Sequence, residues 1–164
     1  MKTDAGETGA AGATSAIDVA QLGEAVGREF VSAWREVAQD AITQFADITG
    51  DRQWIHVDAD RAQRESPYGT TIAHGFLSLS LISALLRDAV GAITGTRMAI
   101  NYGLNKVRFP SPVPAGSRVR GRCTLQQITP IDGGVQATWQ VLVERDGTAK
   151  PACAAEWLVR YYPA

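Results

Sequence analysis

The sequence predicts an α+β fold in which a curved antiparallel sheet wraps around one buried helix. Two observations lead to this prediction. The charge-free stretch from Ile72 to Leu86 is apolar on nearly every side of a helix, so we expect protein to surround it. After this stretch the hydrophobic period changes from 3.6 to 2 residues, which is typical of amphipathic strands with one covered face.

The size and composition of the chain place it among globular single-domain proteins. It has 164 residues, of which 45% are hydrophobic and 20% charged, and this balance excludes wholesale disorder. The net charge of -1 gives no excess of positive charge, so we expect neither nucleic acid nor a membrane as a partner. Residues 1–16 are interpreted as a disordered tail and residues 17–164 as one domain.

The first part of the domain mixes helices and extended backbone. A short helix is predicted over 17–26 and an extended segment over 28–37. From Asp40 the apolar residues recur at three- and four-residue spacing, which predicts a helix, and Gly50 is suited to end it. Residues 51–58 have little periodicity and are interpreted as a loop.

Cap and turn signals lead from this loop to the apolar helix. Asp58 is suited to cap a short helix over 59–64, and the run Ser66-Pro67-Tyr68-Gly69 is typical of a turn. The apolar helix is then expected to extend from about Ala73 to Val90.

Four strands are predicted after this helix. Arg97 to Arg108 is the first, with its alternation broken near Gly103, and turn sequences at 132–134 and 145–147 separate the others. The residues expected to face the helix are Val119, Gly121, Cys123 and Leu125, then Val135, Ala137, Trp139, Val141 and Val143, and finally Cys153, Ala155, Trp157, Val159 and Tyr161. The two cysteines are too few for a disulfide framework, so we expect inert buried thiols and a cytoplasmic protein.

Both histidines of the chain lie in irregular segments, next to groups that suit acid–base chemistry. Asp51 and His56 form a carboxylate–imidazole pair able to hold and deprotonate a water molecule. His74 directly precedes Gly75, which is predicted in the first turn of the apolar helix, where backbone N–H groups lack an acceptor. Because glycine has no side chain, a ligand oxygen can approach that N–H. Such a pair and an oxyanion site suffice for chemistry beside a carbonyl or thioester.

Other kinds of site have less support. The spacing of Asp51, His56 and His74 matches no common zinc pattern, so we expect no metal. The serines of the apolar helix lie mid-helix without a nucleophile-elbow pattern, which argues against nucleophilic catalysis.

Two runs of the sequence carry a family resemblance. They are Phe45-Ala46-Asp47-Ile48-Thr49-Gly50-Asp51-Arg52-Gln53-Trp54-Ile55-His56-Val57-Asp58 and Thr71-Ile72-Ala73-His74-Gly75-Phe76. They resemble the MaoC-like dehydratase family, the (R)-specific enoyl-CoA hydratase branch of hotdog-fold proteins, whose motif reads roughly G-D-x-N-P-x-H-x-D and then I-x-H-G. Gln53-Trp54 replaces its Asn-Pro, as in the subgroup of nodulation protein N, and the segment from Val107 to Val113 resembles the family's strand entry.

The resemblance implies a hotdog fold and a role for each matching residue. Asp51 and His56 match the catalytic acid–base pair. Gly75 matches the residue whose backbone N–H polarises the thioester oxygen. The implied substrate is an acyl-CoA or acyl-carrier thioester, with no cofactor beyond the CoA of the substrate. The resemblance also implies a homodimer in which two sheets join.

Four further residues are expected near this site. Ser83 matches a helix serine that supports the site, although it could instead bond back to a helix carbonyl. His74 is expected to support the start of the helix. Gln53 and Trp54 are expected at the pocket mouth, where the departure from the family motif puts the substrate preference in question.

The implied activity is (R)-specific hydration of a trans-2-enoyl thioester, or the reverse dehydration of a 3-hydroxyacyl thioester. A hotdog thioesterase is one alternative, but such enzymes generally carry a carboxylate on the central helix, and Ile72 to Leu86 contains none. A non-catalytic acyl-thioester-binding protein is another, against which the Asp51–His56 pair argues. Gly75 also has a purely structural alternative, namely close packing of helix and sheet.

Overall fold

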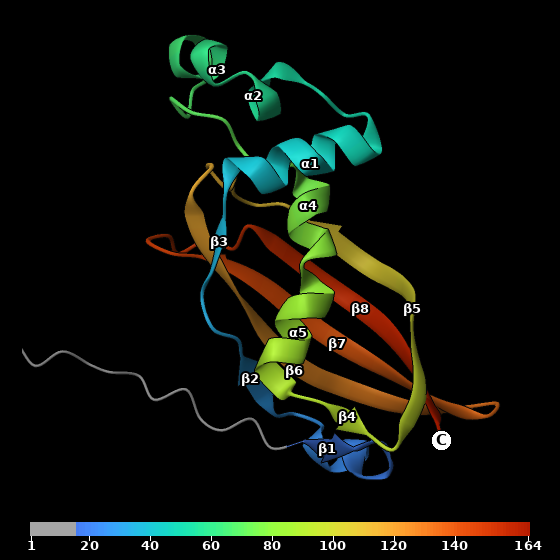
Figure 1. Ribbon diagram of the computed structural model, residues 1–164. Helices are drawn as coiled ribbons and strands as arrows, with labels where there is room; N and C mark the ends of the chain where they lie inside the picture. Colours follow the sequence, from blue (N-terminus) through green and yellow to red (C-terminus); the bar gives the residue numbers. More distant parts are fainter. Residues whose placement is uncertain (1–15) are drawn as a thin grey trace, which may run out of the picture.

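The computed structural model describes residues 16–164, so the predicted tail lies, except for its last residue, outside the described residues. One sheet forms a layer, and two consecutive helices, α4 and α5, run across its face (Figure 1). The elements are β1 (Ile17–Asp18), the 3-10 helix η1 (Val19–Ala25), β2 (Glu29–Val31), β3 (Arg35–Val37), α1 (Gln39–Thr49), α2 (Trp54–Val57), α3 (Ala59–Glu65), α4 (Gly75–Ser80), α5 (Ile82–Val90), β4 (Ile93–Thr94), β5 (Thr96–Arg108), β6 (Ser117–Ile131), β7 (Gly134–Arg145) and β8 (Cys153–Pro163).

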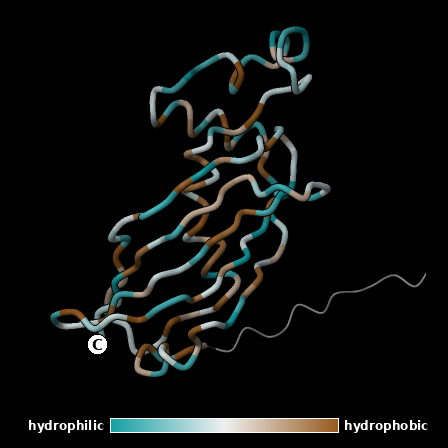
Figure 2. Tube along the Cα trace, turned by 180° about the vertical axis from the view of Figure 1, so that it is seen from behind, coloured by the Kyte–Doolittle hydropathy of each residue, from teal (hydrophilic) through white to brown (hydrophobic). Residues whose placement is uncertain are grey.

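The sheet has six antiparallel strands in the order β2-β6-β7-β8-β5, with β3 also paired to β6. The pairing of β5 with β8 shifts register between Asn101 and Gly103, where the sequence predicted a break. The strand residues predicted to face the helix are buried, apart from Val135, which is half-buried. Figure 2 shows the matching alternation of hydrophobic and hydrophilic residues along the strands. The predicted amphipathic sheet is therefore confirmed.

Burial also accounts for the two cysteines. Both side chains are free thiols inside the core, and burial raises the pKa of Cys123 to about 12 and that of Cys153 to about 11. Because the thiolate is the reactive form, the burial and raised pKa of both thiols disfavour reaction, in line with the prediction.

The apolar helix follows the predicted course, with one interruption at Leu81. Hydrogen bonds cross this point, since the N–H of Leu81 donates to Leu77 O at 3.1 Å and the N–H of Leu85 donates to Leu81 O at 2.9 Å. The expectation that protein surrounds the helix is wrong for one side, where Phe76 is 67% exposed. The reason is that a single sheet covers only one side of the helix, and the other side of its middle and lower part is open in Figure 1.

Gly121 on β6 lets α5 lie close to the sheet. A Cβ at this position would lie 2.8 Å from the Cβ of Leu85, closer than real side chains approach. This glycine on β6 therefore limits how closely α5 can approach the sheet.

Two local predictions need correction. The short helix predicted over 17–26 is present as the 3-10 helix η1, but its predicted start is wrong, because Ile17 and Asp18 form β1 and pair with β4. Residues 51–58 are not all loop, because Trp54–Val57 make one helical turn, α2. The neighbouring predictions hold: Gly50 ends α1 with φ 77°, and the Asp58 carboxylate caps α3 by accepting from the N–H of Arg61 at 2.9 Å.

The helices α1, α2 and α3 form a group over the beginning of α4, away from β1 and β4 (Figure 1). None of the described helices is long and apolar enough to cross a membrane. The short connections within this group, and the one that leads from it to α4, carry the residues that the sequence singled out.

Candidate functional site

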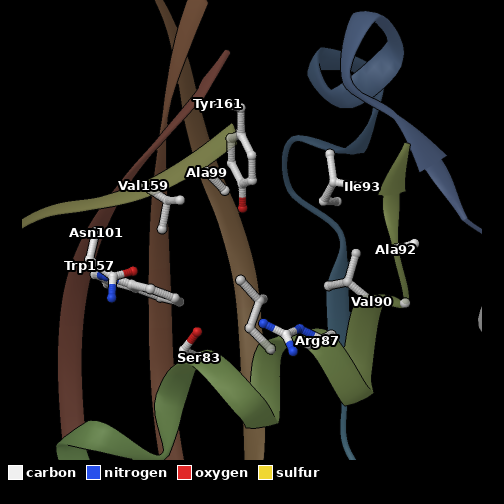
Figure 3. A pocket seen from close by; sticks show the side chains of 12 residues that line it. Ser83, Arg87, Val90, Ala92, Ile93, Ala99, Asn101, Trp157, Val159 and Tyr161 are labelled. Carbon is white, nitrogen blue, oxygen red and sulfur yellow. The ribbon is translucent and has the colours of Figure 1, made fainter. Parts of the chain in front are cut away.

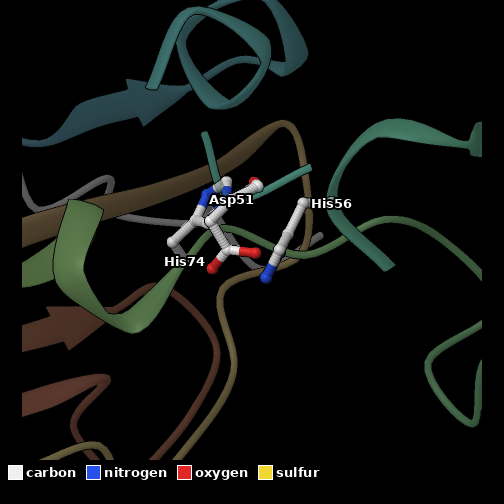
Figure 4. A group of neighbouring side chains, drawn as sticks. All are labelled: Asp51, His56 and His74. Atoms are coloured by element: carbon white, nitrogen blue, oxygen red, sulfur yellow. Dashed lines mark hydrogen bonds between the residues drawn. The ribbon is translucent and has the colours of Figure 1, made fainter. Parts of the chain in front are cut away.

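Three predicted site residues meet where α1, α2 and α4 come together. Asp51 follows the end of α1, His56 lies in α2, and His74 immediately precedes α4. One carboxylate oxygen of Asp51 and one ring nitrogen of each histidine lie within 4.8 Å of one another. Figure 4 shows the Asp51 carboxylate close to a ring nitrogen of His56. The fold thus brings the predicted acid–base pair together.

The ring of His56 is held so that one nitrogen stays available. The side chain is only 6% exposed, and Nδ1 donates a 2.7 Å hydrogen bond to the carbonyl of Ile72. A carbonyl can only accept, so Nδ1 carries the proton and Nε2 of the neutral ring has a free lone pair. Burial lowers the pKa of His56 below its ordinary 6.5, against the raising effects of the Ile72 bond and the Asp51 charge. A neutral imidazole with a free Nε2 suits a general base.

Two residues that the sequence analysis did not single out also hold His56. The Gln39 amide, at the start of α1, donates to the His56 carbonyl at 2.8 Å. The same amide accepts a 2.5 Å hydrogen bond from the Thr71 hydroxyl, and Thr71 is buried. Thr71 lies within the run that carries the family resemblance, but nothing in the periodicity of the sequence indicates a role for Gln39.

His74 contacts both members of the pair. Its Nε2 donates a 2.8 Å hydrogen bond to the backbone carbonyl of Asp51. Its ring stacks on that of His56, with 3.7 Å between centroids and 25° between planes. Phe45 of α1 packs against its ring, with 5.1 Å between centroids.

Gly75 begins α4 beside His56. Its N–H has no hydrogen-bond acceptor among residues 16–164, as expected for the first turn of a helix. A Cβ at this position would lie 3.0 Å from the ring of Phe109. A cavity of about 290 Å³ lies here, and it is lined by His56, Tyr68, Ile72, Ala73, Gly75, Ser78, Phe109, Pro110, Ser111, Pro112, Val113 and Ala152.

Of the predicted site residues, His56 and Gly75 line this cavity, and the other five do not: Asp51, His74, Gln53, Trp54 and Ser83. Gln53 precedes α2, where its carbonyl accepts from the N–H of His56 at 2.9 Å. The indole of Trp54 lies under the guanidinium of Arg61, 4.5 Å from it, because both face the space between α2 and α3. Ser83 lies about two helical turns beyond Gly75. Its hydroxyl makes no bond back to a helix carbonyl within the described residues, whereas Ser80 makes such a bond to Phe76 at 2.7 Å.

Ser83 instead lines two hollows along the seam between the helices and β5. The first, about 300 Å³, is lined by Leu79, Ser80, Ile82, Ser83, Asn101, Tyr102, Gly103, Leu104 and Trp157. The second, about 590 Å³, is lined by Ser83, Leu86, Arg87, Val90, Gly91, Ala92, Ile93, Ala99, Asn101, Trp157, Val159 and Tyr161 (Figure 3). The helices α4–α5 and the strand β5 run in opposite directions, so the beginning of α4 lies near the end of β5. The cavity at Gly75 and Phe109 lies at this end, and the two hollows follow it along the seam.

The cluster of Asp51, His56 and His74 offers three groups of the kind that bind metals, which the sequence spacing did not indicate. Its geometry fits a metal ion poorly. A ring nitrogen binds a metal along a lone pair in the plane of its ring. The rings of His56 and His74 are stacked 3.7 Å apart, so their lone pairs lie in two separate, nearly parallel planes rather than in planes that meet at one ion. The expectation that no metal binds stays a prediction.

Comparisons with known proteins found relatives in sequence and in fold. Residues 21–146 match the family described as MaoC like domain. The 3-hydroxyacyl-thioester dehydratase Z of Mycobacterium tuberculosis is 52% identical over 143 residues, which cover 87% of this chain and 91% of that protein. Nodulation protein N of Rhizobium leguminosarum bv. viciae is 45% identical over 139 residues, covering 84% of each protein. A solved R-hydratase from Pseudomonas aeruginosa, in its unliganded form, has a TM-score of 0.66 and 25% identity over 85% of this chain and 83% of that chain.

Proposed function

Since the chain belongs to the family of MaoC-like domains, we propose that it catalyses the reversible hydration of a trans-2-enoyl thioester to an (R)-3-hydroxyacyl thioester. The family and the hotdog architecture predicted from the sequence are both confirmed. The observation that carries the proposed activity is the meeting of Asp51 and His56 beside the open N–H of Gly75.

In the proposed mechanism, Asp51 and His56 hold one water molecule between them. The free Nε2 of His56 takes a proton from this water as its oxygen bonds to C3 of the enoyl group. The electrons of the C2–C3 double bond move towards the thioester carbonyl, and C2 then receives the proton from the same pair. The elements of one water are thereby added, and dehydration follows the same steps in reverse.

The N–H of Gly75 donates to the thioester oxygen in this proposal. Negative charge develops on that oxygen as the water adds, and a donor already in place stabilises it without reorganisation. This N–H lies in the wall of the cavity that also contains His56. No metal or redox cofactor takes part in the proposed reaction, and any CoA is part of the substrate.

The seam between α4–α5 and β5 suits the acyl chain. Its hollows follow one another from Gly75 towards Val90, and most of the residues that line the far hollow are apolar, although Ser83, Arg87 and Asn101 also line it. Ser83 lies where the two hollows meet. We expect an acyl-CoA or acyl-carrier thioester with its acyl end in this seam.

We also propose that the protein is a homodimer joined along β5. This strand is an edge of the sheet and exposes four large hydrophobic residues: Met98, Ile100, Tyr102 and Leu104. An exposed apolar edge strand is a template for pairing with another strand. A second copy of β5 would extend the sheet and cover the open side of the seam.

Thioester hydrolysis is the second candidate reaction, and the position of a carboxylate on the central helix decides against it. The central helix extends beyond Leu86 to Val90 and includes one carboxylate, Asp88. That carboxylate accepts a 2.7 Å hydrogen bond from the backbone N–H of Ala33, so it is occupied in joining α5 to the segment between β2 and β3. Hydration is therefore the better supported reaction.

The experiment that tests the proposal is a hydration assay on crotonyl-CoA. Loss of the enoyl absorbance, with formation of the (R)-3-hydroxybutyryl product, supports it. A parallel assay with a thiol reagent detects free CoA, which only hydrolysis releases. Release of CoA with the enoyl group intact would identify a thioesterase, and no reaction on enoyl thioesters of any chain length would indicate a binding protein.

A further inference from the structure

We propose that His74 is a positioning residue for the acid–base pair, which fixes the backbone at Asp51 and the ring of His56 at the same time. Its kinetic consequence rests on the proposed hydratase function, whereas its effect on the His56 ring is independent of any activity.

The hydrogen bond to Asp51 fixes the loop after α1. Nε2 of His74 lies 2.8 Å from the Asp51 carbonyl and must be the donor, because a carbonyl only accepts. This bond links the end of α1 to the beginning of α4 across 23 positions of the sequence. Asp51 itself is exposed, and within residues 16–164 its carboxylate accepts only one long hydrogen bond, 3.5 Å from the N–H of Gln53. The anchored backbone is therefore the main restraint on the direction of its carboxylate.

The stacked ring restrains His56 in a different direction. The hydrogen bond from Nδ1 to Ile72 fixes one edge of the His56 ring but permits rotation about that bond. His74 covers one face of the ring at 3.7 Å, and Phe45 in turn packs against His74. The hydrogen bond at the edge of the His56 ring and the stacking on its face together define the direction in which Nε2 points. Displacement of a catalytic group by about 1 Å can reduce turnover by about 100-fold.

The burial of His74 excludes direct contact with substrate. The residue is 3% exposed, and its Nδ1 is inaccessible and has no hydrogen-bond partner in the part of the chain that the structure describes. A residue with only a packing role would need no hydrogen bond to Asp51 and no particular aromatic neighbour. His74 has both, and each contact leads to one member of the pair.

The proximity of His74 also affects the pKa of His56. Asp51 and His74 are the titratable groups that act on it: Asp51 favours a proton on His56, and His74 disfavours it. Of the other residues near the pair, Phe45 and Gln39 of α1 and Phe109 after β5 have no titratable group. Tyr68 lines the same cavity as His56 but is not among the groups that shift its pKa. A phenyl ring in place of His74 would remove the opposing contribution and offer its face to a protonated imidazole. The pKa of His56 is therefore expected to rise in His74→Phe.

Two variants separate the contacts of His74. His74→Phe keeps a stacked ring and loses the hydrogen bond to Asp51, whereas His74→Gln keeps an amide N–H for Asp51 and loses the ring. We expect kcat on crotonyl-CoA to fall about 10- to 100-fold in His74→Phe with little change in KM, because the residue touches no substrate. We expect His74→Gln to retain more activity and the acid limb of the His74→Phe rate profile to move to higher pH.

Proton NMR gives a readout that does not depend on activity. The chain has two histidines, so the one imidazole signal that remains in His74→Phe belongs to His56. Its titration should shift to higher pH than in the parent protein. Val143→Ala, a truncation in the core away from the site, serves as the stability-matched control and should leave the His56 titration unchanged.

The outcomes distinguish the two proposals. If the parent protein hydrates no enoyl thioester, the proposed function fails, and the NMR shift still tests the effect of His74 on His56. If His74→Phe and His74→Gln lose no more activity than Val143→Ala at equal stability, and the His56 titration stays in place, His74 is only a packing residue and the inference is wrong.

Discussion

Gly75 and Phe109 are in contact at the cavity wall, where a Cβ on Gly75 would lie 3.0 Å from the phenyl ring. Two requirements therefore favour glycine at position 75. A side chain there would collide with the ring of Phe109, and it would hinder the approach of a ligand oxygen to the N–H of Gly75. The two requirements lead to different results when both residues are changed.

We expect Gly75→Ala to lower both the melting temperature and kcat, because the new methyl group displaces the Phe109 ring. In Gly75→Ala with Phe109→Leu, the smaller neighbour should restore most of the melting temperature but not kcat, since the methyl group still narrows the cavity around the N–H. Recovery of both quantities in the double variant would mean that glycine serves packing alone.

Asp51→Asn and His56→Gln should each lower kcat by at least about 100-fold with the fold intact, because a positioned acid or base contributes about 10²- to 10⁴-fold. The measurement is crotonyl-CoA hydration, with circular dichroism to verify folding. Asp60→Asn, which alters an exposed carboxylate on α3, is the matched control and should keep normal turnover. Near-normal rates in either site variant would refute the assigned roles.

The stability of the protein should decrease as the pH falls below neutrality, partly through His56. Burial lowers the pKa of His56 in the folded state below 6.5, so the unfolded chain binds this proton more readily. The stabilising contribution is therefore complete above about pH 6.5 and is lost as the pH falls through the folded-state pKa. Denaturant titrations between pH 8 and 5 should show a steeper decline for the parent protein than for His56→Gln. Equal slopes would contradict the buried neutral state of His56.

The chain should sediment as a dimer at micromolar concentration, with twice the 17.5 kDa mass of one chain. Ile100→Lys places a charge on the exposed apolar edge of β5 and should shift the protein towards monomer. Ile48→Lys is the control, because Ile48 is 86% exposed on α1, away from β5. A parent protein that sediments only as a single chain would exclude the proposed dimer.

Removal of metal ions should leave hydration unchanged, because in the proposed mechanism Asp51 and His56 move the proton and the N–H of Gly75 binds the oxyanion without a Lewis acid. The measurement is the crotonyl-CoA rate before and after dialysis against a strong chelator. A rate that disappears, and returns on adding Zn²⁺, would reassign the cluster of Asp51, His56 and His74 as a metal site.

Much of this fold could be predicted from sequence because its signals are local and repeated. The alternation along β6, β7 and β8 is long enough to fix which residues face the helix, and Gly50 carries its own stop signal in a left-handed conformation. By contrast, α2 is a single turn, too short to show a period. The strand β1 depends on pairing with β4, more than seventy residues further along the chain, which no local pattern reveals.

The residues of the candidate site could be proposed from the sequence, but their contacts could not. Asp51, His56, His74 and Gly75 come from two recognisable runs of sequence. The stacking of the two imidazoles depends on how α2 and the beginning of α4 meet in space. The same is true of Gln39, whose amide reaches His56 from a helix with an unremarkable polar start. The placement of Trp54 against Arg61, away from the cavity, likewise follows from the packing of α2 on α3.

The contact between Gly121 and α5 affects the width of the far hollow but not the position of Asp51 and His56. Because it sets how closely α5 approaches the sheet, a larger residue there would lift the helix and alter the width of the far hollow next to Leu86 and Val90. Asp51 and His56 lie beyond the other end of the helix pair and would stay in place. Under the proposed function, a larger residue at position 121, which lines none of the hollows, should change the preferred length of the acyl chain without altering the acid–base pair.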